Sequence, residues 1–249
     1  MTIDPDMPAG GGMTTPEEKA ARPGRLYVLV ELTAVATTIA TVLLIGAYTA
    51  NFWMGPFSIV AAVIVIRYSL WLQGRGLSDC GLGRPSAWLR TILFGIGAWL
   101  VVSIVNGLLI NPIIFRLLGE IPDLQTFEGL SGNLVFYIQL LLLSWTIAAF
   151  GEELLFRGYL LGRIAGLLGG GRAAYGAALV LQAAAFGAAH LYQGLAGVLV
   201  TGSVGLVLGL LFLRARRNLW VVIIAHGLID TVSLTALYLG LDELIRNLT

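Results

Sequence analysis

Long apolar runs and short polar breaks alternate along the chain. Seven runs are long enough to cross about 30 Å of hydrocarbon at a helical rise of 1.5 Å per residue, although the second and fifth are near the lower limit. Stretches containing glycine, proline, asparagine or arginine separate the runs and predict turns. The predicted spans are 26–50, 56–72, 88–110, 132–156, 173–190, 194–213 and 219–239, and the predicted turns are 74–76, 111–112, 169–171 and 214–218.

The composition indicates a membrane protein. The chain is 57% hydrophobic and only 12% charged, whereas a soluble domain carries roughly 25% charged residues. The sequence therefore predicts an all-α, polytopic membrane helical bundle of about seven transmembrane helices, with six to eight possible, in the cell membrane and in contact with lipid. Residues 1–24 predict a disordered tail, and residues 25–249 predict one transmembrane domain.

The charges between the runs predict the orientation. In a seven-span arrangement, most of the 15 lysine and arginine residues lie on one side, which the positive-inside rule assigns to the cytoplasm together with the amino terminus. These residues are Lys19, Arg22, Arg25, Arg75, Arg84, Arg90, Arg157, Arg163, Arg172, Arg214, Arg216 and Arg217. No basic domain stands out, so nothing indicates a nucleic-acid partner.

Two adjacent carboxylates, Glu152 and Glu153, interrupt the apolar pattern of the fourth run. A carboxylate at membrane depth costs about 2.5–3.5 kcal/mol on insertion scales, so such residues are usually functional. Arg157 follows Glu153 by four residues and can pair with it on one helix face. Glu152 points about 100° away and is free to face a cavity. A patch at the membrane boundary, with both carboxylates in water, is the alternative.

Two more clusters lie on later spans, Phe186-x-x-x-His190 and His226-x-x-x-Asp230. Each spacing places two side chains on one helix face. A carboxylate beside an imidazole can fix its tautomer, raise its basicity or share a metal with it. A packed histidine and a polar pair that satisfies itself are the alternatives. Glu31, near a helix end, is expected to snorkel to water, and the role of Arg67 is open.

Helix lengths allow these clusters to meet. The predicted hairpin around 169–171 has legs of nearly equal length, which return His190 to the depth of Glu152. His226 lies about 12 Å in from its own cytoplasmic turn. The sequence therefore permits Glu152, His190 and His226 to converge.

The three motifs resemble those of the CAAX protease and bacteriocin-processing family, called CPBP or Abi. Its signature is EExxxR, then FxxxH, then HxxxN or HxxxD, on successive membrane helices, and the likeness covers about 132–239, the motif-bearing core. The resemblance implies an intramembrane endopeptidase in which Glu152 and His190 activate a water molecule. Glu153 and Arg157 would fix the helix and its charge balance, and His226, with Asp230 as partner, would stabilise the oxyanion.

Relatives in bacteria process bacteriocins or confer self-immunity, so the resemblance implies a peptide or membrane-anchored protein as substrate. Asp230 leaves the mechanism open, because an ionised aspartate cannot donate a hydrogen bond as asparagine would. Glu152, His190, His226 and Asp230 could instead bind a divalent metal such as zinc. The chain has no HExxH motif, and the metal-independent mechanism is slightly favoured.

Two other functions fit the same residues. A proton- or ion-coupled transporter also uses intramembrane glutamate, histidine and aspartate, but no inverted repeat or matched pair of broken helices is visible in the sequence. A non-catalytic membrane scaffold or immunity factor could keep the fold without using the site. The presence of every motif residue argues mildly against that interpretation.

Overall fold

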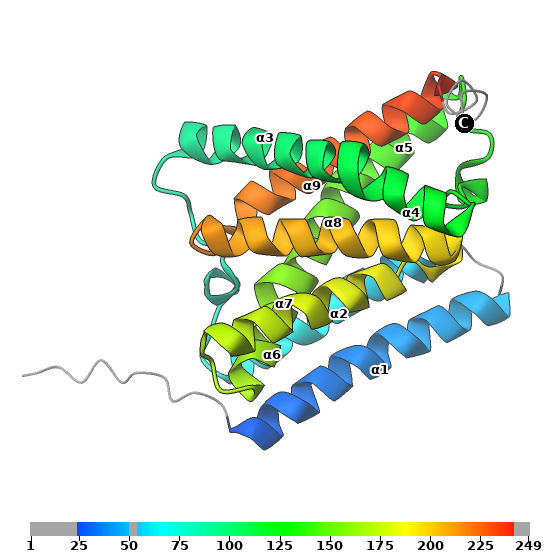
Figure 1. Cartoon of the computed structure of the whole chain (residues 1–249). Coiled ribbons are helices and arrows are strands. Elements are labelled where there is room, and N and C mark those ends of the chain that lie inside the picture. Colours follow the sequence, from blue (N-terminus) through cyan, green and yellow to red (C-terminus); the bar gives the residue numbers. More distant parts are fainter. Residues whose placement is uncertain (1–23, 50–53, 242–249) are drawn as a thin grey trace, which may run out of the picture.

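The structure is a computed structural model that describes residues 24–49 and 54–241. These residues form helices and connecting loops, without a strand among them (Figure 1). The predicted tail, apart from Gly24, lies outside the described residues. The α-helices are α1 (Arg25–Thr49), α2 (Met54–Leu72), α3 (Trp88–Ile104), α4 (Asn111–Leu118), α5 (Leu134–Leu143), α6 (Leu161–Leu167), α7 (Arg172–Ala188), α8 (Gly194–Arg214) and α9 (Leu219–Tyr238).

Shorter helical segments connect or extend these helices. The 3₁₀ segments are η1 (Leu77–Cys80), η3 (Gln125–Phe127) and η6 (Leu191–Gln193), and the π-helical segments are η2 (Val105–Ile110), η4 (Ser144–Glu152) and η5 (Leu154–Leu160). The π-helical segments join α3 to α4 and α5 to α6, so these helices form two long passes, 88–118 and 134–167.

The described chain therefore makes seven helical passes, and six of them are long and apolar enough to cross a membrane. The exception is α7, which has 17 residues. This confirms the predicted fold class, a polytopic all-α bundle, and the protein is a multi-pass membrane protein. In lipid the backbone must satisfy its own hydrogen bonds, which is why such apolar runs become helices.

Two predicted boundaries are wrong. Asn111 and Pro112 do not form a turn, because the helix continues through them to Leu118. The π-helical η2 ends at Ile110, and the Asn111 N–H donates to the Asn106 carbonyl, five residues earlier, just ahead of the proline. This wider turn accommodates the proline without ending the helix. The span predicted to end at 156 continues to Leu167 because η5 and α6 extend it.

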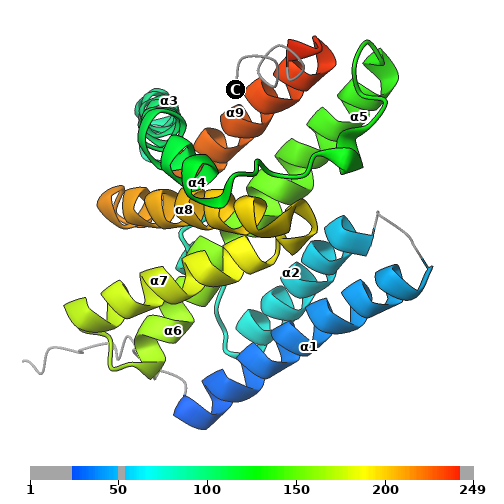
Figure 2. The ribbon, with the colours of Figure 1, turned by 45° about the vertical axis from the view of Figure 1, so that its right-hand side comes forward.

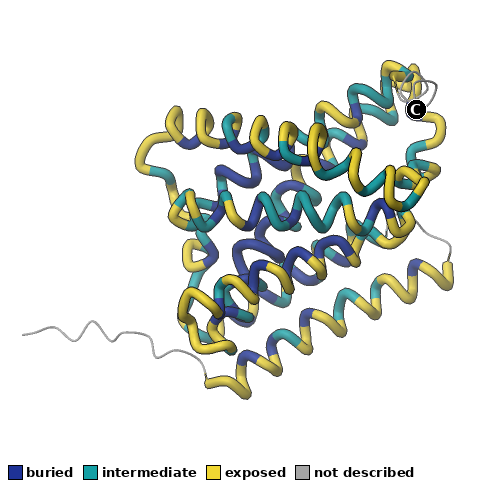
Figure 3. Tube along the Cα trace, viewed as in Figure 1, coloured by how far each residue is buried: buried dark blue, intermediate teal, exposed yellow. Residues whose placement is uncertain are grey.

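The long pass from α5 to α6 lies at the centre of the bundle. The α1–α2 pair lies at one edge and the α3–α9 pair at the other, and the η4 segment contacts both α2 and α9 (Figures 1 and 2). Residues 153–159 in the middle of this pass are all buried, whereas α1 and α3 are largely exposed on their outer faces (Figure 3). Because the exposed residues are apolar, these outer faces suit lipid.

The α7–α8 hairpin packs closely through glycine. A Cβ atom on Gly187 would lie 2.5 Å from the Val198 carbonyl oxygen and 3.0 Å from the Gly202 Cα atom. Only a residue without a side chain allows this approach, as is common between membrane helices. The packing fixes the end of α7, just before His190.

A buried polar cluster attaches α1 to the bundle. Glu31 is only 5% exposed, so the prediction that it snorkels to water is wrong. Its Oε1 accepts hydrogen bonds from Arg163 Nη2 at 3.1 Å, from Gln73 Nε2 at 2.7 Å and from the Ser69 hydroxyl. These contacts supply the partners that a buried carboxylate requires. Arg67, by contrast, is exposed.

Candidate active site

The Glu152–Arg157 motif lies on a widened helix. In η4 and η5 the backbone N–H groups bond to carbonyl groups five residues earlier rather than four. Such segments are rare and occur frequently at functional sites. The two segments contact α2, α7 and α9, so the motif residues face three neighbouring helices.

Glu153 and Arg157 form an ion pair without any exposed surface. Arg157 Nη1 donates to Glu153 Oε1 at 2.7 Å, as the four-residue spacing predicts. Arg157 therefore lies inside the bundle, and counting it among the cytoplasmic loop charges is wrong. A charge this deeply buried requires a partner of opposite sign.

His226 of α9 binds the same carboxylate. Its Nδ1 lies 2.8 Å from Glu153 Oε1, and because the oxygen of an ionised carboxylate only accepts, Nδ1 is the donor. Glu153 thus joins the first motif to the third. The sequence spacing pairs His226 with Asp230 and does not predict this contact with Glu153.

Phe186 of α7 lies between the three motifs. Its ring centroid is 4.3 Å from the guanidinium carbon of Arg157, 5.0 Å from the His190 ring and 6.0 Å from the His226 ring. The contact with Arg157 is a cation–π interaction, which is strengthened by removal from water. The three helices therefore bring their motifs together around one aromatic ring.

His190 is held by the backbone just beyond the end of α7. Its Nδ1 lies 2.9 Å from the Phe186 carbonyl oxygen. A carbonyl oxygen can only accept, so Nδ1 carries a proton, and in the neutral ring Nε2 is left as an acceptor. The side chain is half-buried, which leaves Nε2 accessible to a small molecule.

Asp230 is oriented by a serine. Ser144 Oγ donates to Asp230 Oδ2 at 2.7 Å, whereas Asp230 Oδ1 lies 3.6 Å from His226 Nε2, beyond ordinary hydrogen-bond distance. Ser144 is only 5% exposed and belongs to η4. The sequence analysis missed Ser144, although a serine within an apolar run eight residues before Glu152 is a recognisable signal.

Several polar atoms at the site lack a partner within the described part of the chain. Glu152 is partly buried, and its Oε2 is inaccessible and makes no hydrogen bond; the same holds for Glu153 Oε2 and Arg157 Nη2. Buried polar atoms in proteins are rarely left unpaired. These atoms are therefore the least satisfied polar groups of the described site.

The four candidate metal ligands, Glu152, His190, His226 and Asp230, do not form a metal centre as arranged here. Within residues 24–49 and 54–241, no group of three or more histidine, cysteine, aspartate or glutamate side chains is spaced to hold a metal ion. His226 Nδ1 is already bound to Glu153. The protein groups at the site are instead arranged as hydrogen-bonded pairs.

The fold and this cluster define a multi-pass membrane protein with a polar site inside its helical bundle. Residues 134–232 match the family model described as Rce1-like, Type II CAAX prenyl endopeptidase Rce1-like. This segment carries all three motifs and is similar to the CAAX-protease type of intramembrane peptidase, so the resemblance drawn from the motifs is confirmed. No curated protein and no solved structure matches the chain.

Proposed function

We propose that the protein is an intramembrane endopeptidase in which Glu152 and His190 activate a water molecule. The observation that supports this most is the meeting of the three motifs around Phe186. Glu152 adjoins Glu153 of this cluster in the sequence, and its buried Oε2 has no hydrogen-bond partner among the described residues. A carboxylate removed from bulk water is a stronger base. It can therefore accept a proton from a bound water molecule.

Glu152 and His190 take complementary roles in this mechanism. His190 Nε2 accepts one hydrogen bond from the water and orients it, because its Nδ1 is fixed on the Phe186 carbonyl. Glu152 takes the other proton as the water oxygen attacks the peptide carbonyl carbon. The proton then passes to the leaving amine when the C–N bond breaks.

Glu153, Arg157 and Asp230 act through His226. Glu153 holds Nδ1 and is itself held by Arg157. As an imidazolium, His226 keeps its Nδ1 proton on Glu153, and its Nε2 proton, with Asp230 nearby, stabilises the oxyanion of the tetrahedral intermediate. In this proposal the donor to the oxyanion is the imidazole and not the carboxylate, so Asp230 does not have to donate a hydrogen bond.

The substrate is a peptide or a membrane-anchored protein in the cell membrane, as in bacteriocin processing or self-immunity. The peptidase family of residues 134–232 supports this substrate class. A substrate of this kind can reach a site inside the bundle from the lipid, without passing through bulk water.

Cleavage of a library of membrane-tethered peptides by the purified protein tests the proposal. We expect Glu152→Ala and His190→Ala each to lower cleavage by about 10²-fold or more, the usual contribution of general acid–base catalysis. Glu128→Ala, in an exposed loop, is the matched control and should cleave normally. Unchanged cleavage in either site variant removes that residue from the mechanism.

Two further arms address the alternatives. We expect cleavage to survive a chelator, and loss with recovery on adding zinc would replace the metal-independent mechanism. Potential-driven uptake by liposomes containing the protein, without cleavage, would favour a transporter.

A further inference from the structure

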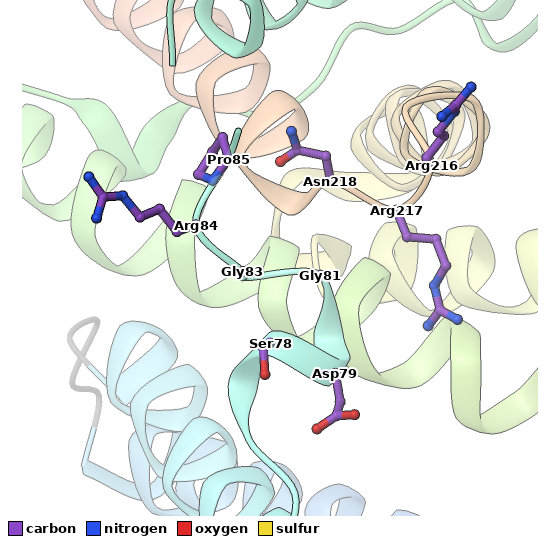
Figure 4. A pocket seen from close by; sticks show the side chains of 9 residues that line it. All are labelled: Ser78, Asp79, Gly81, Gly83, Arg84, Pro85, Arg216, Arg217 and Asn218. Carbon is purple, nitrogen blue, oxygen red and sulfur yellow. The ribbon is translucent and has the colours of Figure 1, made fainter. Parts of the chain in front are cut away.

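A cavity of about 420 Å³ opens at the end of the bundle that the loop charges assign to the cytoplasm. The segment 78–85, which precedes α3, forms one wall, and the turn between α8 and α9 forms the other (Figure 4). Arg84 and Arg216 extend on opposite sides of it, with Asn218 between them. Arg217 also lines the cavity, so three arginines lie at its rim.

The two walls are fixed to each other by the backbone. The Leu219 N–H donates to the Gly81 carbonyl at 2.9 Å, and Trp220 Nε1 donates to the Gly83 carbonyl at 3.2 Å. Gly81 has φ +89°, and a Cβ atom there would lie 2.1 Å from the Arg217 carbonyl oxygen. The cavity is therefore built from tightly apposed segments and not from loose loops.

The arginines are held in an unusual backbone conformation. Arg216 and Arg217 have φ +54° and +62°, a left-handed conformation that is uncommon for residues other than glycine. Backbone strain of this kind gathers at ligand-binding and functional segments. Glycine adopts this conformation without strain. The presence of two arginines here therefore favours a function for their side chains.

The charge of the cavity is positive. Its one lining carboxylate, Asp79, already receives the Gly76 N–H at 2.9 Å and lies 3.7 Å from Arg75. Arg84 and Arg216 are exposed and make no ion pair or side-chain hydrogen bond with any described residue. No described carboxylate therefore balances these two cations.

Two tryptophans indicate where the cavity lies relative to the membrane surface. Trp88 and Trp220 begin α3 and α9, with ring centroids 5.2 Å apart. Tryptophan gathers at the level of the lipid headgroups, and Trp220 is bonded directly to Gly83 of the cavity wall. The exposed Leu89 and Ile92 of α3 continue from this level with an apolar surface.

We propose that this cavity binds the phosphate of an anionic phospholipid headgroup. Guanidinium groups bind phosphate through paired hydrogen bonds, and basic pockets on the cytoplasmic side of membrane bundles recognise anionic headgroups. The apolar surface of α3 below the cavity is placed to receive the acyl chains. A free phosphate ion has the same chemistry at the cavity but would not use this surface.

Lipid binding to the purified, delipidated full-length protein tests the proposal. The ligands are phosphatidylglycerol, phosphatidylcholine and inorganic phosphate, and the readouts are the dissociation constant and the rise in unfolding temperature on binding. Arg84→Gln/Arg216→Gln is compared with Arg25→Gln/Arg172→Gln, an equal change in charge at exposed arginines outside the cavity.

We expect phosphatidylglycerol to bind wild type and control alike, and the cavity variant roughly 30-fold more weakly, since each arginine near an anionic surface contributes about fivefold. Equal binding by the cavity variant and wild type would overturn the proposal. So would an equal loss in the control, which indicates a general charge effect. Phosphate binding as tight as that of the lipid would assign the site to a free anion instead.

Discussion

The Glu153 carboxylate binds both Arg157 and His226. Removing its charge is therefore the most informative single change at the site. In Glu153→Gln the side chain keeps its size and one acceptor oxygen but leaves the Arg157 cation without a counter-charge. Both side chains are fully buried. Glu153 also holds His226, so two neighbouring groups lose their ionic partner together.

The expected loss is large on the scale of single substitutions. Removing one member of a buried ion pair costs roughly 3–5 kcal/mol, because the remaining charge stays buried. Glu152→Gln should change stability by less than about 1 kcal/mol, since Glu152 makes no ion pair or hydrogen bond with any described residue that would be lost. Substitutions of the two adjacent glutamates are therefore predicted to have different effects. Glu153→Gln should lower stability, and Glu152→Gln should lower catalysis.

The assay is the free energy of unfolding in mixed micelles titrated with sodium dodecyl sulfate, measured together with peptide cleavage. Arg157→Met and the double variant Glu153→Gln/Arg157→Met complete a double-mutant cycle. Neutralising both partners removes the stranded charge, so the double variant should be more stable than Glu153→Gln alone. A Glu153→Gln protein as stable as wild type, or a double variant less stable than either single one, would refute the reasoning.

Three further predictions concern positions around the site. Ser144→Ala should cost about 1 kcal/mol and lower kcat with little change in KM, because it frees Asp230; a change in KM alone would contradict this positioning role. Glu31→Gln should weaken the attachment of α1 through Arg163 and increase hydrogen exchange of the backbone amides of α1, and an unchanged exchange rate there would count against the cluster. Burial raises the pKa of the Cys80 thiol to about 11, so the thiolate is scarce at neutral pH and its reaction with maleimide should be slow until the protein unfolds; rapid labelling of the folded protein would be inconsistent with this burial.

The helical passes were predictable because lipid imposes helices on long apolar runs. The pairing of Glu153 with Arg157 followed from a four-residue spacing within one helix. The continuation through Pro112 did not follow, because it depends on the π-helical η2 just before it. No local composition rule distinguishes a wider turn from an ordinary helical one.

Contacts between distant segments were the least predictable part of the site. Ser144 bonds to Asp230, 86 residues away, and Arg163 to Glu31, 132 residues away. Their partners are set by helix crossings, which the periodicity of one helix does not determine. The four-residue spacing therefore predicts that His226 lies near Asp230, which is 3.6 Å away, but it does not predict the bond from His226 to Glu153.

The central claim is that Glu152 and His190 act on one water molecule. Cleavage rates of Glu152→Gln, His190→Asn and the double variant, measured on one peptide substrate, test it most directly. Residues that act as a unit have non-additive effects, so the double variant should be no slower than the slower single variant. Losses that multiply in the double variant would show that the two side chains work independently and would contradict the claim.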